Sequence, residues 1–188
     1  MEAPSPRVTS LRADSRRQSG SVAAVARAGA IAGIVAGMMM AMYQMVVGAI
    51  ASEPTAAPGI DTSFWTPVTA IPSVPFGEQW LHGSFDFWAV VLGLGGHMMN
   101  AVVLGVIGVA LLVAVLGRRP GIAAAMALGM AFGIAVEAVL VNLVINNIQD
   151  VDTFYTSTPE WSWWVAHGLF GATLGALAAI LLRRRADA

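Results

Sequence analysis

Four long runs of apolar residues dominate this chain, and together they contain a single charged side chain, Glu137. The runs cover about residues 29–52, 87–117, 121–147 and 161–182. A helix needs about 20 apolar residues to cross the hydrocarbon core of a bilayer, and each run is long enough. The sequence therefore predicts an all-α, polytopic membrane protein built as a bundle of four transmembrane helices.

The composition supports this class and excludes several kinds of chemistry. Charged residues make up 11% of the chain, whereas soluble domains carry roughly a quarter. There is no cysteine, so disulfides, thiolate metal ligands and thiol nucleophiles are excluded. The sequence contains no phosphate-binding glycine loop and no metalloprotease motif. We therefore expect a protein without enzymatic activity.

The transmembrane domain, residues 28–182, has a basic segment at each end. Residues 1–27 are polar and contain five Arg, which predicts a disordered cytoplasmic tail, and residues 183–188 form a basic cytoplasmic end. The long loop at residues 53–86 contains five of the nine prolines. Because proline removes a helical hydrogen-bond donor, we expect this loop to form no continuous helix and to lie along the outer membrane surface.

The arginines predict the orientation. All ten lie in the N-terminal tail, in the turn after the second run, or after the fourth run. Basic residues favour the cytoplasmic side, so both termini are expected in the cytoplasm of a bacterial cell, with the protein in its inner membrane. All six Trp lie on the opposite side and predict an aromatic belt at the outer interface: Trp65, Trp80, Trp88, Trp161, Trp163 and Trp164.

One alternative concerns the first run. Ala49-Ile50-Ala51 resembles a signal-peptidase site that follows a basic segment, and cleavage after Ala51 would leave three helices. The apolar run before it is longer than the usual 7–15 residues of a signal peptide, about 20. It also carries regularly spaced glycines, which favour a helix that stays in the bundle.

Small residues recur at intervals of three or four in every run, which places them on one helix face. Such faces let transmembrane helices approach closely. The chain also reads as two tandem helical hairpins, because aligning His97 with His167 brings Leu104-Gly105 onto Leu174-Gly175. The predicted stripes are Gly29, Gly33, Gly37 and Ala41; Ala101, Gly105 and Gly108; Gly129 and Gly133; and Gly171 and Gly175.

Most of the strongly polar residues within the runs continue these stripes. Ionisable groups in a membrane are costly and by default indicate a functional site. We therefore expect one polar cluster inside the bundle, in the outer half of the membrane. It comprises Glu137, His97, His167, Asn100 and Gln44, while Asn142 falls off the packing face.

Three interpretations of this cluster stay open. It can be a structural polar core in an accessory subunit, with hydrogen bonds that set helix register. It can be a proton or ion relay, or a small-solute path, in which Glu137 titrates beside the two histidines. It can be a divalent-metal or redox site with His97, His167 and Glu137 as ligands. We expect the lipid bilayer and other membrane subunits as partners, no nucleic acid, and no cofactor unless the metal interpretation holds.

Three short segments carry a resemblance to a known family. They are FWTP at 64–67, GGHMMNAVVLG at 95–105 and HGLFGATLGAL at 167–177, after a first helix with spaced glycines. With these segments, residues 28–182 resemble uncharacterised bacterial four-helix membrane proteins, broadly of the YagU-like type. The resemblance implies an inner-membrane location and a similar helix count, and it implies no activity.

Overall fold

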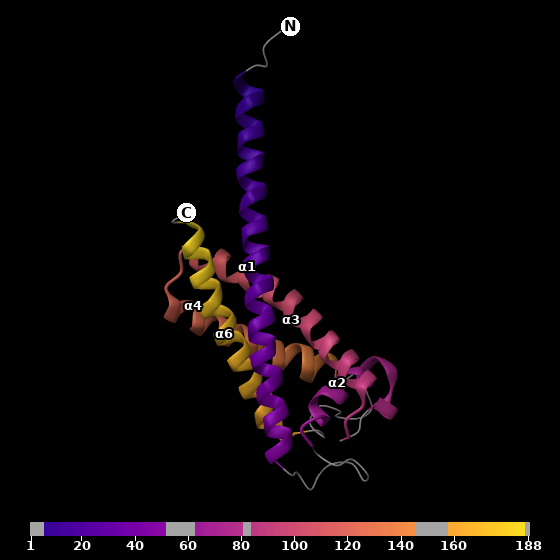
Figure 1. Ribbon diagram of the computed structural model, residues 1–188. Helices are drawn as coiled ribbons and strands as arrows, with labels where there is room; N and C mark the ends of the chain where they lie inside the picture. Colours follow the sequence, from indigo (N-terminus) through magenta and orange to yellow (C-terminus); the bar gives the residue numbers. More distant parts are fainter. Residues whose placement is uncertain (1–5, 52–62, 81–83, 146–157, 187–188) are drawn as a thin grey trace.

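The computed structural model describes residues 6–51, 63–80, 84–145 and 158–186, and nearly all of them are helical (Figure 1). Asp86 caps the start of α3 by accepting a 2.7 Å hydrogen bond from the Ala89 N–H. Gly117, with φ of +76°, ends that helix. The elements are α1 (Pro6–Ile50), α2 (Thr66–Phe76), the 3₁₀ turn η1 (Glu78–Trp80), α3 (Phe87–Leu116), α4 (Ile122–Val136), the π-helix η2 (Glu137–Ile145) and α6 (Glu160–Ala186).

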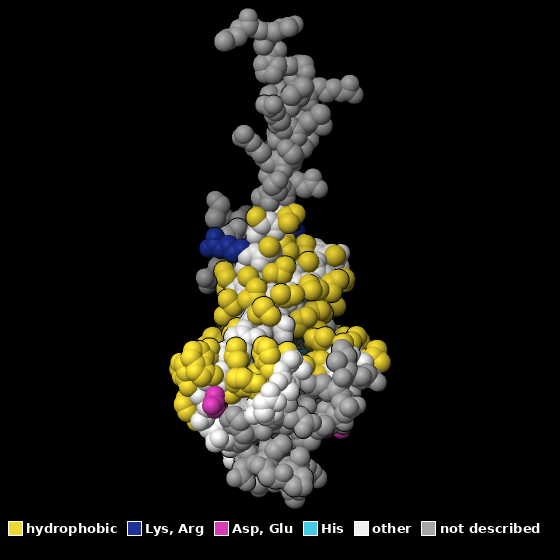
Figure 2. Space-filling model, turned by 90° about the vertical axis from the view of Figure 1, so that its right-hand side faces the viewer, with side chains coloured by type: hydrophobic (Ala, Val, Ile, Leu, Met, Phe, Trp, Pro, Cys, Tyr) yellow, Lys and Arg dark blue, Asp and Glu magenta, His cyan; other side chains and the backbone are white. Residues whose placement is uncertain are grey.

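Within the described residues, four segments are long and apolar enough to cross a membrane, which confirms the predicted all-α, multi-pass bundle. They are Val22–Ile50, Phe87–Leu116, Ile122–Ile145 and Glu160–Arg183. Figure 2 shows apolar side chains around the middle of the molecule, with arginines at one rim and acidic side chains towards the other. We call the first the arginine end (Arg27, Arg118, Arg119 and Arg183) and the other the tryptophan end (Trp65, Trp88 and Trp161).

The N-terminal segment differs from the prediction of a disordered tail. Helix α1 begins at Pro6 and runs without a break into the first span, so that it projects beyond the rest of the bundle (Figure 1). Extending an existing helix needs no new nucleus, and each added residue gains a backbone hydrogen bond. The span therefore serves as the template on which this Ala- and Arg-containing segment continues the helix.

Small residues hold the helices together in two pairs, as the stripes predicted. In the pair α1–α3, a methyl group added to Gly105 would lie 2.5 Å from the Gly29 carbonyl oxygen. In the pair α4–α6, a methyl group on Gly129 would collide with the Gly171 carbonyl oxygen, and one on Gly171 with that of Gly129. Each pair therefore packs backbone against backbone, which only residues without a side chain allow.

The two pairs share one packing register, which supports the tandem-hairpin interpretation. Gly33 lies against Ala101 and Gly105 in the first pair, as Gly129 lies against Gly171 and Gly175 in the second. A histidine stands four residues before this contact in both α3 and α6, at His97 and His167. In this register Ala41 of α1 corresponds to Glu137 of the second pair, since each follows its reference glycine by eight residues.

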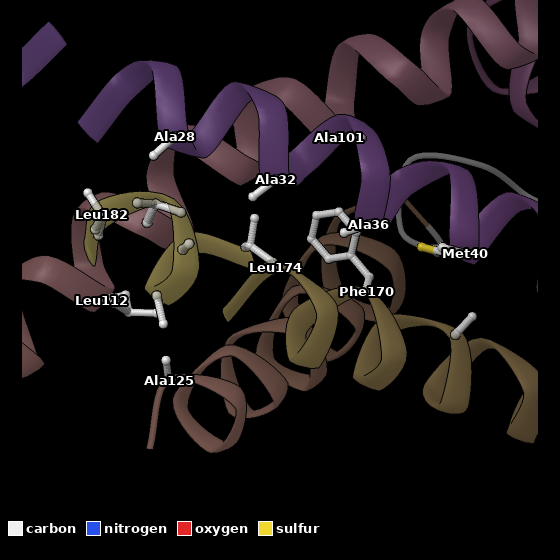
Figure 3. Packing of buried hydrophobic residues seen from close by; sticks show 14 residues of the cluster. Ala28, Ala32, Ala36, Met40, Ala101, Leu112, Ala125, Phe170, Leu174 and Leu182 are labelled. Carbon is white, nitrogen blue, oxygen red and sulfur yellow. The ribbon is translucent and has the colours of Figure 1, made fainter. Parts of the chain in front are cut away.

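A second face of α1 joins the pairs. Its small residues pack against Phe170, Leu174 and Leu182 of α6, as Figure 3 shows. Helices α3 and α4 make few contacts with each other away from this core. The bundle is therefore tight along α1 and α6 and looser between α3 and α4. The α1 residues on this face are Ala28, Ala32, Ala36 and Met40.

The proline-rich loop corrects one expectation, because residues 66–76 form the helix α2 and most of that helix is buried. Pro67 occupies the first turn, where a missing N–H costs nothing. Pro72 deprives the Val68 carbonyl of its usual helical donor, and that oxygen lies directly against Gly93 of α3. Glycines at positions 48 and 93 thus let α2 wedge between α1 and α3 instead of lying on the membrane surface.

Candidate functional site

A cavity of about 110 Å³ lies where α1, α2, α3, η2 and α6 meet, near the tryptophan end. We call it the polar cavity, because Gln44, His97, Asn100 and His167 line it among apolar side chains. A water molecule needs only about 10–15 Å³ of such volume, so the cavity holds several waters or a small ligand. The apolar lining includes Pro67, Val68, Ile71, Leu104, Val136, Leu140, Trp163 and Phe170.

Glu137 lies behind the wall of this cavity and is paired with one of the two predicted histidines. Its Oε2 is 2.8 Å from Nδ1 of His167, with Glu137 fully buried and His167 7% exposed. The Trp163 carbonyl oxygen is 3.0 Å from the same nitrogen and can only accept, so Nδ1 carries a hydrogen.

The helix changes its winding at Glu137, where α4 gives way to the π-helix η2. In a π-helix, hydrogen bonds join residues that are five positions apart. Asn142 accordingly donates a 3.2 Å hydrogen bond from its side-chain nitrogen to the Glu137 carbonyl oxygen. Asn142 is thus bonded to the backbone at Glu137, and it is not among the residues that line the polar cavity. Short π-helical segments occur frequently at functional sites.

His97 stands on another wall and bonds elsewhere. Its Nε2 lies 2.9 Å from the Gly37 carbonyl oxygen of α1, so this nitrogen donates. The described part of the chain contains no group of three His, Asp or Glu side chains placed to hold a metal ion. The three predicted metal ligands are thus divided into the pair Glu137–His167 and a separate His97.

Gln44 is buried at 3% exposure and lines the cavity beside Ser162 of α6. The Ser162 hydroxyl has two acceptors in reach, the Pro159 carbonyl at 2.6 Å and Gln44 Oε1 at 3.1 Å. It has one hydrogen, so the two bonds compete. The other amide atom of Gln44, Nε2, has no hydrogen-bond partner among the described residues. A buried polar group left in this way costs about 1–3 kcal/mol, which favours an occupant of the cavity that bonds to it.

Asn100 corrects part of the predicted cluster, because its side chain is exposed and not packed inside the bundle. It lines the cavity at the mouth, together with the exposed Leu140 across the gap. Trp163 corrects the aromatic belt, since it is buried beneath α2 against Ala70 and Val141. The sequence pattern also gave no sign of Ser162, because a lone serine in an apolar helix carries no distinctive signal.

No family model, no curated protein and no solved structure matches the chain. The resemblance of residues 28–182 to YagU-like proteins stays a prediction.

Proposed function

We propose that this protein is a non-enzymatic accessory subunit of the bacterial inner membrane, whose working part is a small-molecule site in the polar cavity. The observation that carries this is the cavity itself, at which five helices place Gln44, His97, Asn100 and His167 among apolar side chains. Ligand sites have this character, a mostly apolar hollow with a few convergent polar groups. A purely structural polar core would need the hydrogen bonds but not the space.

A proton or ion relay through Glu137 is the second candidate. The buried contact between Glu137 and His167 favours it, because such pairs mark proton paths in membranes. A relay across the bilayer also needs polar groups between Glu137 and the arginine end. In the parts of the described spans that lie between the polar cavity and the arginine end, Thr173 is the one polar side chain apart from the terminal arginines. Proton flux into proteoliposomes that Glu137→Gln abolishes would establish this function instead.

The metal or redox alternative has the weakest support. Two imidazoles and a carboxylate suit Zn, Fe or Cu when they converge on one point. Here Glu137 contacts His167, while His97 bonds to the backbone of α1. Elemental analysis of the purified protein tests this alternative directly.

Access to the cavity tests the proposal without knowledge of the ligand. The chain has no native cysteine, so single cysteines report cleanly. We expect Ala41→Cys, on the cavity wall, to react with methyl methanethiosulfonate in detergent. Ala36→Cys, on the same helix at a fully buried position, should react at least about tenfold more slowly, because it must wait for local opening. Equal protection of both thiols, read by mass spectrometry, would refute a small-molecule site.

The orientation is tested in the same cysteine-free background. The positive-inside rule places both termini and the turn after α3 in the cytoplasm. In intact spheroplasts an impermeant maleimide should therefore label Ser84→Cys and spare Ser10→Cys, Gly121→Cys and Ala186→Cys. Permeabilised cells provide the control, in which all four should react. Labelling of Ser10→Cys or Ala186→Cys in sealed spheroplasts would reverse the proposed topology.

A further inference from the structure

A second cavity, of about 230 Å³, lies between α3, α4 and α6 on the side of the arginine end. Its lining is wholly apolar and includes Leu112, Leu128 and Leu174, so we call it the apolar cavity. Hydrocarbon is the kind of occupant that such a lining favours.

The two cavities follow one gap between the helices. Leu104 lines the polar cavity and Gly108, four residues on, lines the apolar one. Phe170 and Leu174 of α6 repeat this relation, as do Val136 and Phe132 of α4. Residues four apart share a helix face, so the cavities are neighbours one turn apart on three helices.

At Gly108, side chains of α4 and α6 lie close against the backbone of α3. A methyl group added there would lie 2.7 Å from a Leu174 methyl carbon and 2.9 Å from the Phe132 ring. Leu174 and Phe132 therefore fill the space beside Gly108, and a chain that runs from the polar to the apolar cavity has to follow the lipid-facing side of the gap.

The gap faces the bilayer along its length. Asn100 and Leu140 at the rim of the polar cavity are exposed, as are Leu111 and Val115 at the rim of the apolar one. All four lie inside membrane-spanning segments. An occupant that enters here comes from the lipid phase, so it must itself be soluble in the bilayer.

The histidines of the polar cavity indicate which chemical groups an occupant carries there. His97 Nε2–H donates to the Gly37 carbonyl, and His167 Nδ1–H faces the Trp163 carbonyl and Glu137. The remaining nitrogen of each neutral ring is therefore an acceptor. An occupant that suits two acceptors on different helices carries two hydroxyl donors. The apolar side chains around these acceptors favour an uncharged ring over a charged group.

We propose that the two cavities together bind a lipid-soluble quinol, an aromatic diol with one hydrocarbon tail. The diol lies in the polar cavity between His97 and His167, and the tail follows the lipid-facing side of the gap to the rim of the apolar cavity. This inference rests on the proposed function, because it names the ligand class of the same site. It is a statement about binding and includes no electron transfer.

Four probes separate head from tail. Binding of 2-decylbenzene-1,4-diol to the protein in lipid nanodiscs is measured, with thermal unfolding as a second readout. We expect this decyl diol to bind at least about tenfold more tightly than benzene-1,4-diol, which lacks the tail. It should exceed by the same factor the dimethyl ether of the decyl diol, which lacks the hydroxyl donors. It should also bind more tightly than 1-decanol. A tailless diol, an ether or a decanol of equal affinity would each overturn the proposal, the last in favour of a lipid alcohol.

Two variants locate the parts of the ligand. His97→Phe should weaken the decyl diol about tenfold through the loss of one acceptor. Leu111→Trp fills the apolar cavity from its exposed rim, where a larger side chain leaves the packing of the bundle intact. It should remove the higher affinity of the decyl diol over benzene-1,4-diol. Val103→Leu, on the exposed face of α3, is the control and should change neither. If no probe binds while Ala41→Cys still reacts, the quinol is wrong and the small-molecule site stands; if that thiol is also inert, both fail.

Discussion

Gly133→Ala is expected to destabilise the bundle by about 3 kcal/mol or more, although it adds a single methyl group. The new carbon would collide with the His167 carbonyl oxygen, with the Gly171 backbone nitrogen only 3.2 Å away. Neither neighbour is the tip of a flexible side chain, so α4 and α6 must separate. Because His167 sits at this contact, the same change should also disturb its pairing with Glu137.

Gly95→Ala is the matched control, the same substitution at a helical glycine of α3. No heavy atom lies within 4 Å of its added methyl group. Replacing a helical glycine in open space stabilises by about 0.5–1 kcal/mol, so the two variants should shift stability in opposite directions. Thermal unfolding in detergent, followed by tryptophan fluorescence, measures both. Equal loss in the two variants would mean that the close approach of α4 and α6 does not hold the fold together.

The helix pairs were predictable because their signal is local and repeated. A glycine every fourth residue places bare backbone on one face, and in a membrane such faces seek each other. Gly129 and Gly133 meeting Gly171 is the direct result. Sequence alone did not say which stripe would meet which, since every stripe offers the same kind of surface.

Helix α2 and the π-helix were not predictable from local rules. Pro67, Pro72 and Pro75 argue against a helix, yet burial against glycines of the neighbouring helices outweighs the hydrogen bonds that they remove. The π-helix that begins at Glu137 has no mark in the sequence, because its apolar residues read like the α-helix before them. Both features depend on contacts between segments far apart in the chain.

The site was predicted as a set of residues, but its pairing was not. Depth and face grouped these residues in one cluster, and the structure has Gln44, His97 and His167 around one cavity with Glu137 behind it. The same reasoning expected both histidines beside Glu137. Because Gly37 has no side chain, His97 instead reaches the Gly37 backbone carbonyl, which accepts the hydrogen bond that a carboxylate would otherwise accept.

The pairing leads to a second large effect, that Glu137 and His167 are energetically coupled and Glu137 and His97 are not. Glu137 is fully buried, and its carboxylate lies 2.8 Å from the His167 ring. Removing one member of such a pair leaves the other without its partner, at a cost of about 3–5 kcal/mol when the survivor is charged. We therefore expect Glu137→Gln and His167→Gln each to lower the free energy of unfolding by several kcal/mol.

Once either residue is replaced, removing the second should cost much less, because the interaction has already been lost. The double-mutant cycle should show a coupling of about 1–3 kcal/mol in detergent unfolding. The matching cycle of Glu137→Gln with His97→Gln should be additive within about 0.5 kcal/mol, since His97 bonds to Gly37. Coupling in the His97 cycle with additivity in the His167 cycle would mean that Glu137 turns toward α3 in the membrane. The polar cavity would then be built around a different pair, with the acceptor on α6 no longer held in place by the carboxylate.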